Sequence, residues 1–115
     1  MNIDSTQLGP GQILISLAGR LDITGASEIE TRFSALASHT QATLVDMSGV
    51  TFLASIGIRL ILATAKSLRK HGGNMVLFGC DPQVERVLLT TGVNELTSIV
   101  ATRDDAMRLV ETPAS

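Results

Sequence analysis

The sequence predicts a single α/β domain, and its length, composition and patterning all favour this class. Its 115 residues are enough for one domain with a hydrophobic core. Hydrophobic residues make up 44% of the chain and charged residues 17%, which is typical of a globular protein. Strand-like and helix-like segments alternate in the order β-β-α-β-α-β-α-β-α. This order predicts a mixed sheet of four to five strands with about four helices packed on it.

The first part of the chain predicts two strands and a helix. Apolar residues alternate over 12–19, which indicates a strand, and a short strand near Ile3 could pair with it through a Gly-Pro-Gly turn. Apolar residues then recur at helical spacing over 24–39. We expect Thr24 or Ser27 to cap the start of this helix, with acidic residues in its first turn.

The middle of the chain predicts a strand, a long helix and a second strand. The apolar segment 42–49 indicates a buried strand that ends at Ser48-Gly49. From Ser55 to His71 an apolar stripe recurs at helical spacing, and Gly72-Gly73 closes it. Segment 74–80 is apolar on both faces, so we expect a central strand there.

The last part of the chain predicts a helix, an edge strand and a final helix. Asp81-Pro82 supplies an N-cap followed by proline at the first helical position. Residues 96–101 form a short apolar run of the kind found in edge strands. Thr102 and Asp105 have the spacing of a capping box before a helix over 104–111.

Composition and charge argue against several classes of partner. The net charge is −2, aromatic residues make up 3%, and the strongest basic run lies at a helix end, so we expect no nucleic-acid binding. Cys80 is the only cysteine, which predicts a reducing compartment without disulfides or thiolate metal sites. The sequence has neither a signal-peptide pattern nor a bilayer-length apolar run, so we expect a cytoplasmic protein without membrane insertion.

The sequence does not predict an enzyme, a cofactor or a metal site. His39 and His71 both stand at polar helix ends, where a cation suits the helix dipole. Ser55 lies between a strand and a helix, as in a nucleophile elbow, but Leu53 occupies the position of the first glycine. The base that a hydrolase needs is also missing, because His71 lies roughly 24 Å further along the helix at ~1.5 Å per residue.

Ser55 has two competing interpretations. A serine at a helix start can be a simple N-cap. It can also be an exposed residue that is presented to a partner for modification. A phosphate at this position would be stabilised by free N–H groups and the helix dipole. Gly57 would let another surface approach closely, and the apolar residues Phe52, Leu53 and Ile56 suggest a docking surface around the hydroxyl.

The segment from Leu44 to Val100 resembles the STAS domain family, specifically the bacterial anti-sigma factor antagonists. Family members have an apolar strand ending in Asp or Asn, a Phe-or-Tyr-apolar pair, Asp-Ser-Ser/Thr-Gly, a long helix and Gly-Gly. Here the corresponding residues are Asp46, Phe52-Leu53, Ala54 to Gly57 and Gly72-Gly73. The segment "LAGRLDITGASEIE" is similar to the family's Gly-x-Leu-Asp turn. The resemblance implies a single STAS domain over 1–115, with its core over about 11–111.

The resemblance also implies a switching mechanism. The partner would be an anti-sigma factor with a GHKL-type serine kinase fold, which phosphorylates Ser55. The unphosphorylated antagonist would bind this factor and free its sigma factor for transcription, and a serine phosphatase would reset the switch. Asp22 matches a family aspartate that contacts the partner or orients the serine region. The implied partner-binding residues are Asp22, Thr24, Ser48, Thr51, Phe52, Leu53, Ala54, Ile56, Gly57 and Arg59.

One departure from the family pattern leaves an alternative open. Ala54 stands where the family has Asp, and Ile56 stands where it has a second hydroxyl residue. Loss of the carboxylate removes a group that could position Ser55, and equally a charge that would repel a phosphate. The alternative is a STAS assembly subunit that is never phosphorylated, either a signalling scaffold or a partner of a lipid-transporter ATPase.

Overall fold

The computed structural model describes residues 1–38 and 40–111, so the helix-end residue His39 lies outside the described residues. Five strands and four helices follow one another in the expected order, with one short 3₁₀ turn, η1, before the last strand. The elements are β1 (Asn2–Gly9), β2 (Gln12–Leu21), α1 (Ile23–Ala37), β3 (Ala42–Leu53), α2 (Ser55–Lys70), β4 (Asn74–Phe78), α3 (Pro82–Thr90), η1 (Val93–Glu95), β5 (Ser98–Val100) and α4 (Arg103–Glu111).

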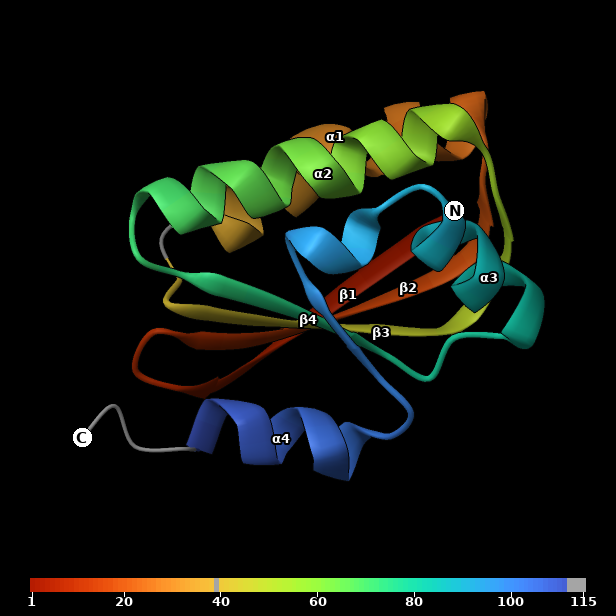
Figure 1. Ribbon diagram of the computed structural model, residues 1–115. Helices are drawn as coiled ribbons and strands as arrows, with labels where there is room; N and C mark the ends of the chain where they lie inside the picture. Colours follow the sequence, from red (N-terminus) through yellow and green to blue (C-terminus); the bar gives the residue numbers. More distant parts are fainter. Residues whose placement is uncertain (39, 112–115) are drawn as a thin grey trace.

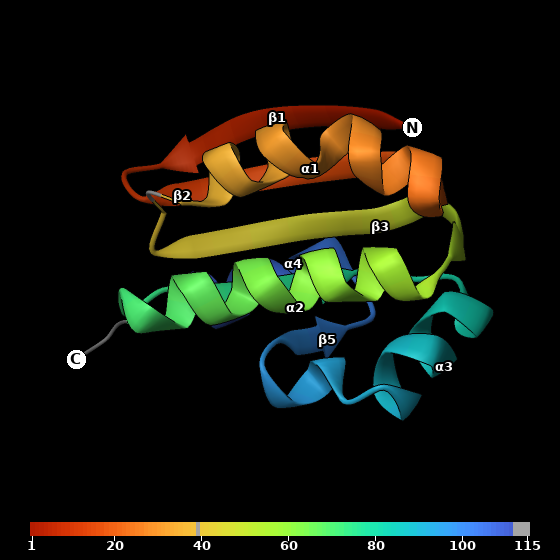
Figure 2. The same ribbon diagram turned by 90° about the horizontal axis from the view of Figure 1, so that it is seen from above.

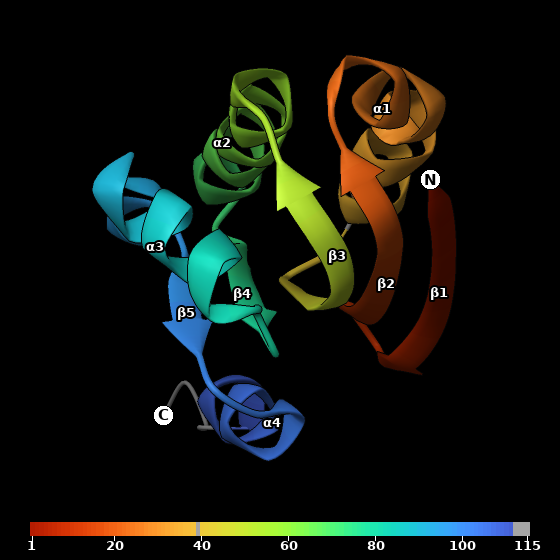
Figure 3. The ribbon, with the colours of Figure 1, turned by 90° about the vertical axis from the view of Figure 1, so that its right-hand side faces the viewer.

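The strands form one mixed sheet in the order β1-β2-β3-β4-β5. β1 pairs antiparallel with β2, and the other neighbours pair parallel. β4 is an interior strand and β5 an edge strand, as the sequence predicted. Because β2 to β5 run in one direction, their carboxyl ends lie at the same end of the sheet, on the right in Figure 1. Figure 3 looks onto that end, with the arrowheads of β2 and β3 toward the viewer.

Helices cover both faces of the sheet. α1 and α2 lie side by side on one face, with α1 over β1 and β2, while α4 covers the other face (Figures 1 and 2). The larger core lies under α1 and α2 and includes Val84 and Leu88 of α3. The smaller core lies under α4 and is built from Leu14, Ala42, Leu44, Val76, Phe78 and Ala106. The buried strands are therefore apolar on both faces.

Two helix caps follow the sequence prediction. The Asp81 carboxylate accepts a hydrogen bond of 3.0 Å from the N–H of Gln83 at the start of α3, with Pro82 as the first helical residue. The Thr102 hydroxyl accepts one of 3.1 Å from the N–H of Asp105 at the start of α4. Both caps satisfy N–H groups that lack a partner within the helix.

The predicted start of α1 is wrong. The helix begins at Ile23, and its cap is Asp22, whose carboxylate accepts a hydrogen bond of 2.9 Å from the N–H of Gly25. Thr24 therefore lies inside the first turn and Ser27 further along the helix, and this turn carries no acidic residue. Asp22 takes the role because an ionised carboxylate one residue before the helix meets free N–H groups and the positive end of the dipole.

Three strands are longer than their local patterns indicate, β2 by only two residues, to Leu21. β1 extends over Asn2–Gly9 although its residues are mostly polar and exposed, because it pairs along its length with β2. β3 passes the predicted stop at Gly49 and continues to Leu53, paired with β2 up to Leu21. Gly49 lets β3 lie close to β2, since a Cβ at this position would lie 2.8 Å from the carbonyl oxygen of Leu17.

Candidate functional site

The residues singled out by the sequence gather mainly where the parallel strands end and the helices begin. The turn from β2 to α1, the turn from β3 to α2 and the start of α3 all lie at this end of the sheet (Figure 3). We call it the carboxyl edge and define it by residues 19–25, 50–57 and 81–87. In open α/β sheets this end is where binding sites are usually built, because loops and helix starts converge there.

Ser55 is exposed at the carboxyl edge as the first residue of α2. The interpretation of Ser55 as the N-cap is wrong, because Ala54 has the extended cap conformation and its carbonyl accepts hydrogen bonds from Gly57 and Ile58. Ala54 has no polar side chain, so no side chain caps this helix. The Ser55 hydroxyl thus stands at the positive end of a helix dipole without a capping role.

Gly57 is buried against the end of β2 and does not form part of the open surface. A Cβ on Gly57 would lie 2.5 Å from Leu21 Cγ and 2.9 Å from the Leu21 carbonyl oxygen. That carbonyl accepts a hydrogen bond of 3.0 Å from the N–H of Ala54. The close approach that the sequence attributed to a partner is therefore made by the protein's own strand, and it fixes where α2 starts.

Asp22 lies half-buried on the neighbouring turn. The hydrogen bond from the Gly25 N–H and, after it, the Arg20 guanidinium lower the pKa of this carboxyl, so it is ionised at neutral pH. Arg20 Nε lies 3.4 Å from Asp22 Oδ2, and the guanidinium carbon lies 4.2 Å from the centre of the Phe52 ring. Asp22 thus orders both the start of α1 and the side chain of Arg20.

The sequence predicted an apolar rim around Ser55 made of Phe52, Leu53 and Ile56, and the structure changes this set at two positions. Phe52 is 40% exposed and Ile56 is 36% exposed, so both side chains are accessible at the surface. Leu53 is only 7% exposed and belongs to the larger core. The rim gains Ile23, which is 77% exposed at the start of α1 and was missed by sequence reasoning. Recognising Asp22 as the N-cap would have placed Ile23 in the first helical turn.

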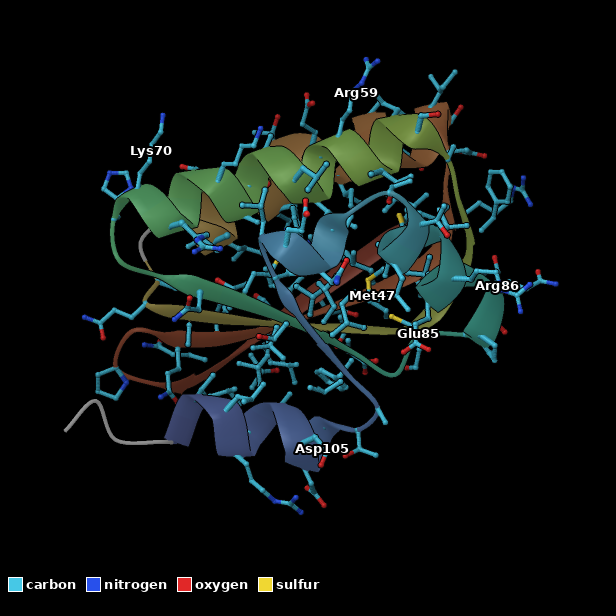
Figure 4. All side chains as sticks on the ribbon, viewed as in Figure 1. Met47, Arg59, Lys70, Glu85, Arg86 and Asp105 are labelled. Carbon is cyan, nitrogen blue, oxygen red and sulfur yellow. The ribbon has the colours of Figure 1, made fainter. Side chains whose placement is uncertain are left out.

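The remaining predicted residues lie at varying distances from Ser55. Thr51 is exposed near the end of β3, and its hydroxyl donates a hydrogen bond of 3.4 Å to the carbonyl of Gly19. Ser48 lies about 16 Å before Leu53 at ~3.3 Å per residue, beside Gly79, so the structure does not bring it next to Ser55. Thr24 and Arg59 are exposed, and Arg59 points away from the sheet (Figure 4).

The described residues offer neither an activated thiol nor a metal cluster. Burial, followed by the nearby carboxylates of Glu85 and Asp46, raises the pKa of Cys80 to about 11, so its thiol stays protonated at neutral pH. In the described ranges, no group of three or more His, Cys, Asp or Glu side chains could hold a metal ion. None of the helices described is both long and apolar enough to cross a membrane.

Comparison with known proteins agrees with this fold. The family model of the STAS domain matches residues 5–106. The anti-sigma-B factor antagonist of Bacillus subtilis is 24% identical over 101 residues, covering 88% of this chain and 92% of that protein. The crystal structure of an anti-sigma factor antagonist from Mycobacterium paratuberculosis is 27% identical, covers 95% of this chain and 94% of that chain, and superposes with a TM-score of 0.81.

The fold also matches that of the anti-sigma factor antagonist SpoIIAA, a Bacillus cell-fate determinant. Its unphosphorylated form gives a TM-score of 0.80 at 19% identity, covering 99% of this chain and 100% of that one. Its phosphorylated form gives 0.73 at 19% identity, covering 96% and 100%. With a family model that spans most of its length and the five-stranded sheet described above, the chain belongs to the STAS domain family.

Proposed function

We propose that this protein is an anti-sigma factor antagonist that phosphorylation of Ser55 switches off. It would act in the cytoplasm as a regulator of sigma-factor-dependent transcription, without catalytic activity of its own. Its partners would be an anti-sigma factor with a GHKL-type serine kinase fold and a serine phosphatase. The relatives named as anti-sigma factor antagonists support the class of function. The observation that carries the proposal is the exposed Ser55, which does not cap α2 and is followed by the exposed apolar residue Ile56.

The chemistry of the site suits a binding surface that a charge can disrupt. Exposed apolar side chains such as Ile23, Phe52 and Ile56 favour burial against a partner. A phosphate on Ser55 would bring roughly −1.5 to −2 charges into this contact and would require their desolvation. The N–H groups at the start of α2 would tolerate the phosphate within the free protein, so modification would oppose binding without opposing folding.

The test is phosphoryl transfer followed by binding. The chain is incubated with ATP and each purified GHKL-type kinase of its source organism, and modified residues are mapped by mass spectrometry. We expect one phosphate on Ser55, lost in Ser55→Ala and retained in Ser27→Ala, a matched change at an exposed serine within α1. Ser55→Asp should weaken binding to the same kinase at least tenfold while thermal unfolding stays close to that of the wild type.

The assembly-subunit function remains the second candidate because Ser55 is flanked by the apolar Ala54 and Ile56. An interface that is never phosphorylated gains from such neighbours and never has to accommodate a phosphate beside them. If no kinase modifies or binds the chain, and it instead forms a stable complex with a transporter ATPase or a signalling scaffold, the switch is refuted. The second candidate then replaces it.

A further inference from the structure

Arg20 is held in a fixed orientation at the carboxyl edge by two neighbours. It pairs with Phe52 across β2 and β3, and its guanidinium lies over the exposed Phe52 ring at 4.2 Å. Its Nε faces the Asp22 carboxylate at 3.4 Å. The side chain is nevertheless 61% exposed. An arginine ordered before binding loses less conformational entropy when a partner arrives.

The outer part of this guanidinium is available to a partner. In the part of the chain that the structure describes, Arg20 makes no ion pair other than the one through Nε. The two terminal nitrogens therefore keep their N–H donors for a group from outside. Their planar fork fits the two oxygens of a carboxylate.

Next to the Phe52 ring lies a surface hollow of about 150 Å³ between the end of β3 and α3. It is lined by Thr51, Phe52, Leu53, Gln83, Val84 and Val87. Most of these side chains are apolar, and a space of this size admits one aliphatic side chain or a small ring. The Phe52 ring is thus in contact with the Arg20 guanidinium and also forms part of the wall of the hollow.

We propose that Arg20 and the hollow beside Phe52 form a second anchor for the anti-sigma factor, in addition to the contact around Ser55. The partner would place a carboxylate on the Arg20 guanidinium and a neighbouring apolar side chain in the hollow. This proposal rests on the proposed function. The charges select the occupant: one ordered arginine, already beside the Asp22 carboxylate, suits a single carboxylate, whereas a chain of net charge −2 does not favour a polyanion such as nucleic acid. Arginine is also one of the residues enriched at interface hot spots, which cluster in well-packed pockets.

The test measures affinity and its salt dependence for the kinase that binds the wild-type chain. Arg20→Gln removes the charge, and Lys70→Gln is the charge-matched control at the opposite end of α2 (Figure 4). Gln83→Trp, at an exposed position, covers the hollow with a large side chain. We expect Arg20→Gln and Gln83→Trp each to weaken binding about tenfold, and Lys70→Gln to leave it unchanged. Arg20→Gln should also flatten the dependence of affinity on salt. All three should unfold close to the wild-type temperature, since surface ion pairs contribute little to stability.

The outcomes separate this proposal from the function on which it rests. If Ser55→Asp loses binding while Arg20→Gln and Gln83→Trp bind like Lys70→Gln, the second anchor is refuted and the proposed function stands. If no candidate kinase binds the wild type, both fall. If Arg20→Gln binds weakly, the charge-reversed variant Arg20→Glu is tested against kinase variants in which one acidic residue is changed to arginine. One of these kinase variants should bind Arg20→Glu with restored affinity. Failure of every such exchange refutes the carboxylate contact.

Discussion

Gly57 separates two interpretations of a glycine next to a candidate modification site. The sequence favoured an open approach for a partner, whereas the structure places Gly57 against Leu21 of its own β2. We expect Gly57→Ala to destabilise the fold by about 2 kcal/mol, because the new methyl group meets both a buried side chain and a backbone carbonyl. Urea unfolding followed by far-UV circular dichroism measures this, since the chain has no Trp or Tyr.

The matched control for Gly57→Ala is Gly9→Ala. A Cβ on Gly9 meets only the Gln12 side chain, at 3.8 Å, which is ordinary contact. Its stability should change by less than ~0.5 kcal/mol. A Gly57→Ala variant as stable as Gly9→Ala would show that α2 can shift away from β2. That result would support the earlier interpretation, in which Gly57 lets the surface of a partner approach closely.

Asp22 gives the carboxyl edge a pH dependence with a definite sign. Its pKa in the folded protein lies below the ordinary value of 3.8, so the ionised form stabilises folding above that pH. This contribution is lost as the pH falls through the lowered pKa. Asp22→Asn keeps a good N-cap without a titrating group. We expect the wild type to unfold at a higher temperature than Asp22→Asn at pH 7 and to lose that advantage toward pH 3. A difference that stays constant with pH would contradict the assigned cap.

At the scale of whole elements, most of the fold could be predicted because periodicity records which face of each segment is buried. The long helix after Ser55, the caps Asp81 and Thr102, and the short edge strand β5 all follow local patterns. The errors concentrate at the carboxyl edge. The end of β3 depends on pairing with β2, where Leu53 meets Leu21, 32 residues earlier in the sequence, and no local pattern contains this pairing. The burial of Leu53 and the exposure of Ile23 follow from that pairing and from the true start of α1.

α2 is the helix whose stability is easiest to raise, because no side chain caps its start. Ala54 is its N-cap residue and supplies no side-chain acceptor. Ala54→Asp should stabilise the protein by about 1 kcal/mol, because a carboxylate at this position accepts from free N–H groups and suits the dipole. Urea unfolding at pH 7 measures the gain, and Ala54→Leu, which cannot accept, is the control. Equal stabilities of the two variants would mean that the first turn of α2 has no unsatisfied donors.

At the scale of the whole molecule, one sheet separates two hydrophobic cores, and the larger one supports the carboxyl edge. The larger core under α1 and α2 fixes the carboxyl edge, on which Ser55, Phe52 and Arg20 lie. The smaller core under α4 covers the opposite face and is built from other residues. β3 and β4 nevertheless contribute to both, through Leu44 and Phe78 on one side and through Val45 and Leu77 on the other. The two faces should therefore unfold together.

Ala106→Asp tests this coupling, because Ala106 is fully buried in the smaller core. A charge buried there without a partner should lower the free energy of unfolding by about 3 kcal/mol. Since β3 and β4 carry both cores, we expect one urea transition, shifted as a whole, and unchanged kinase binding under conditions where the protein is folded. The control is Arg103→Asp at the exposed first residue of α4, where an acidic residue suits the helix dipole. If Ala106→Asp instead loses part of its helical signal early while the main transition stays in place, α4 unfolds as a separate unit and the carboxyl edge does not depend on it.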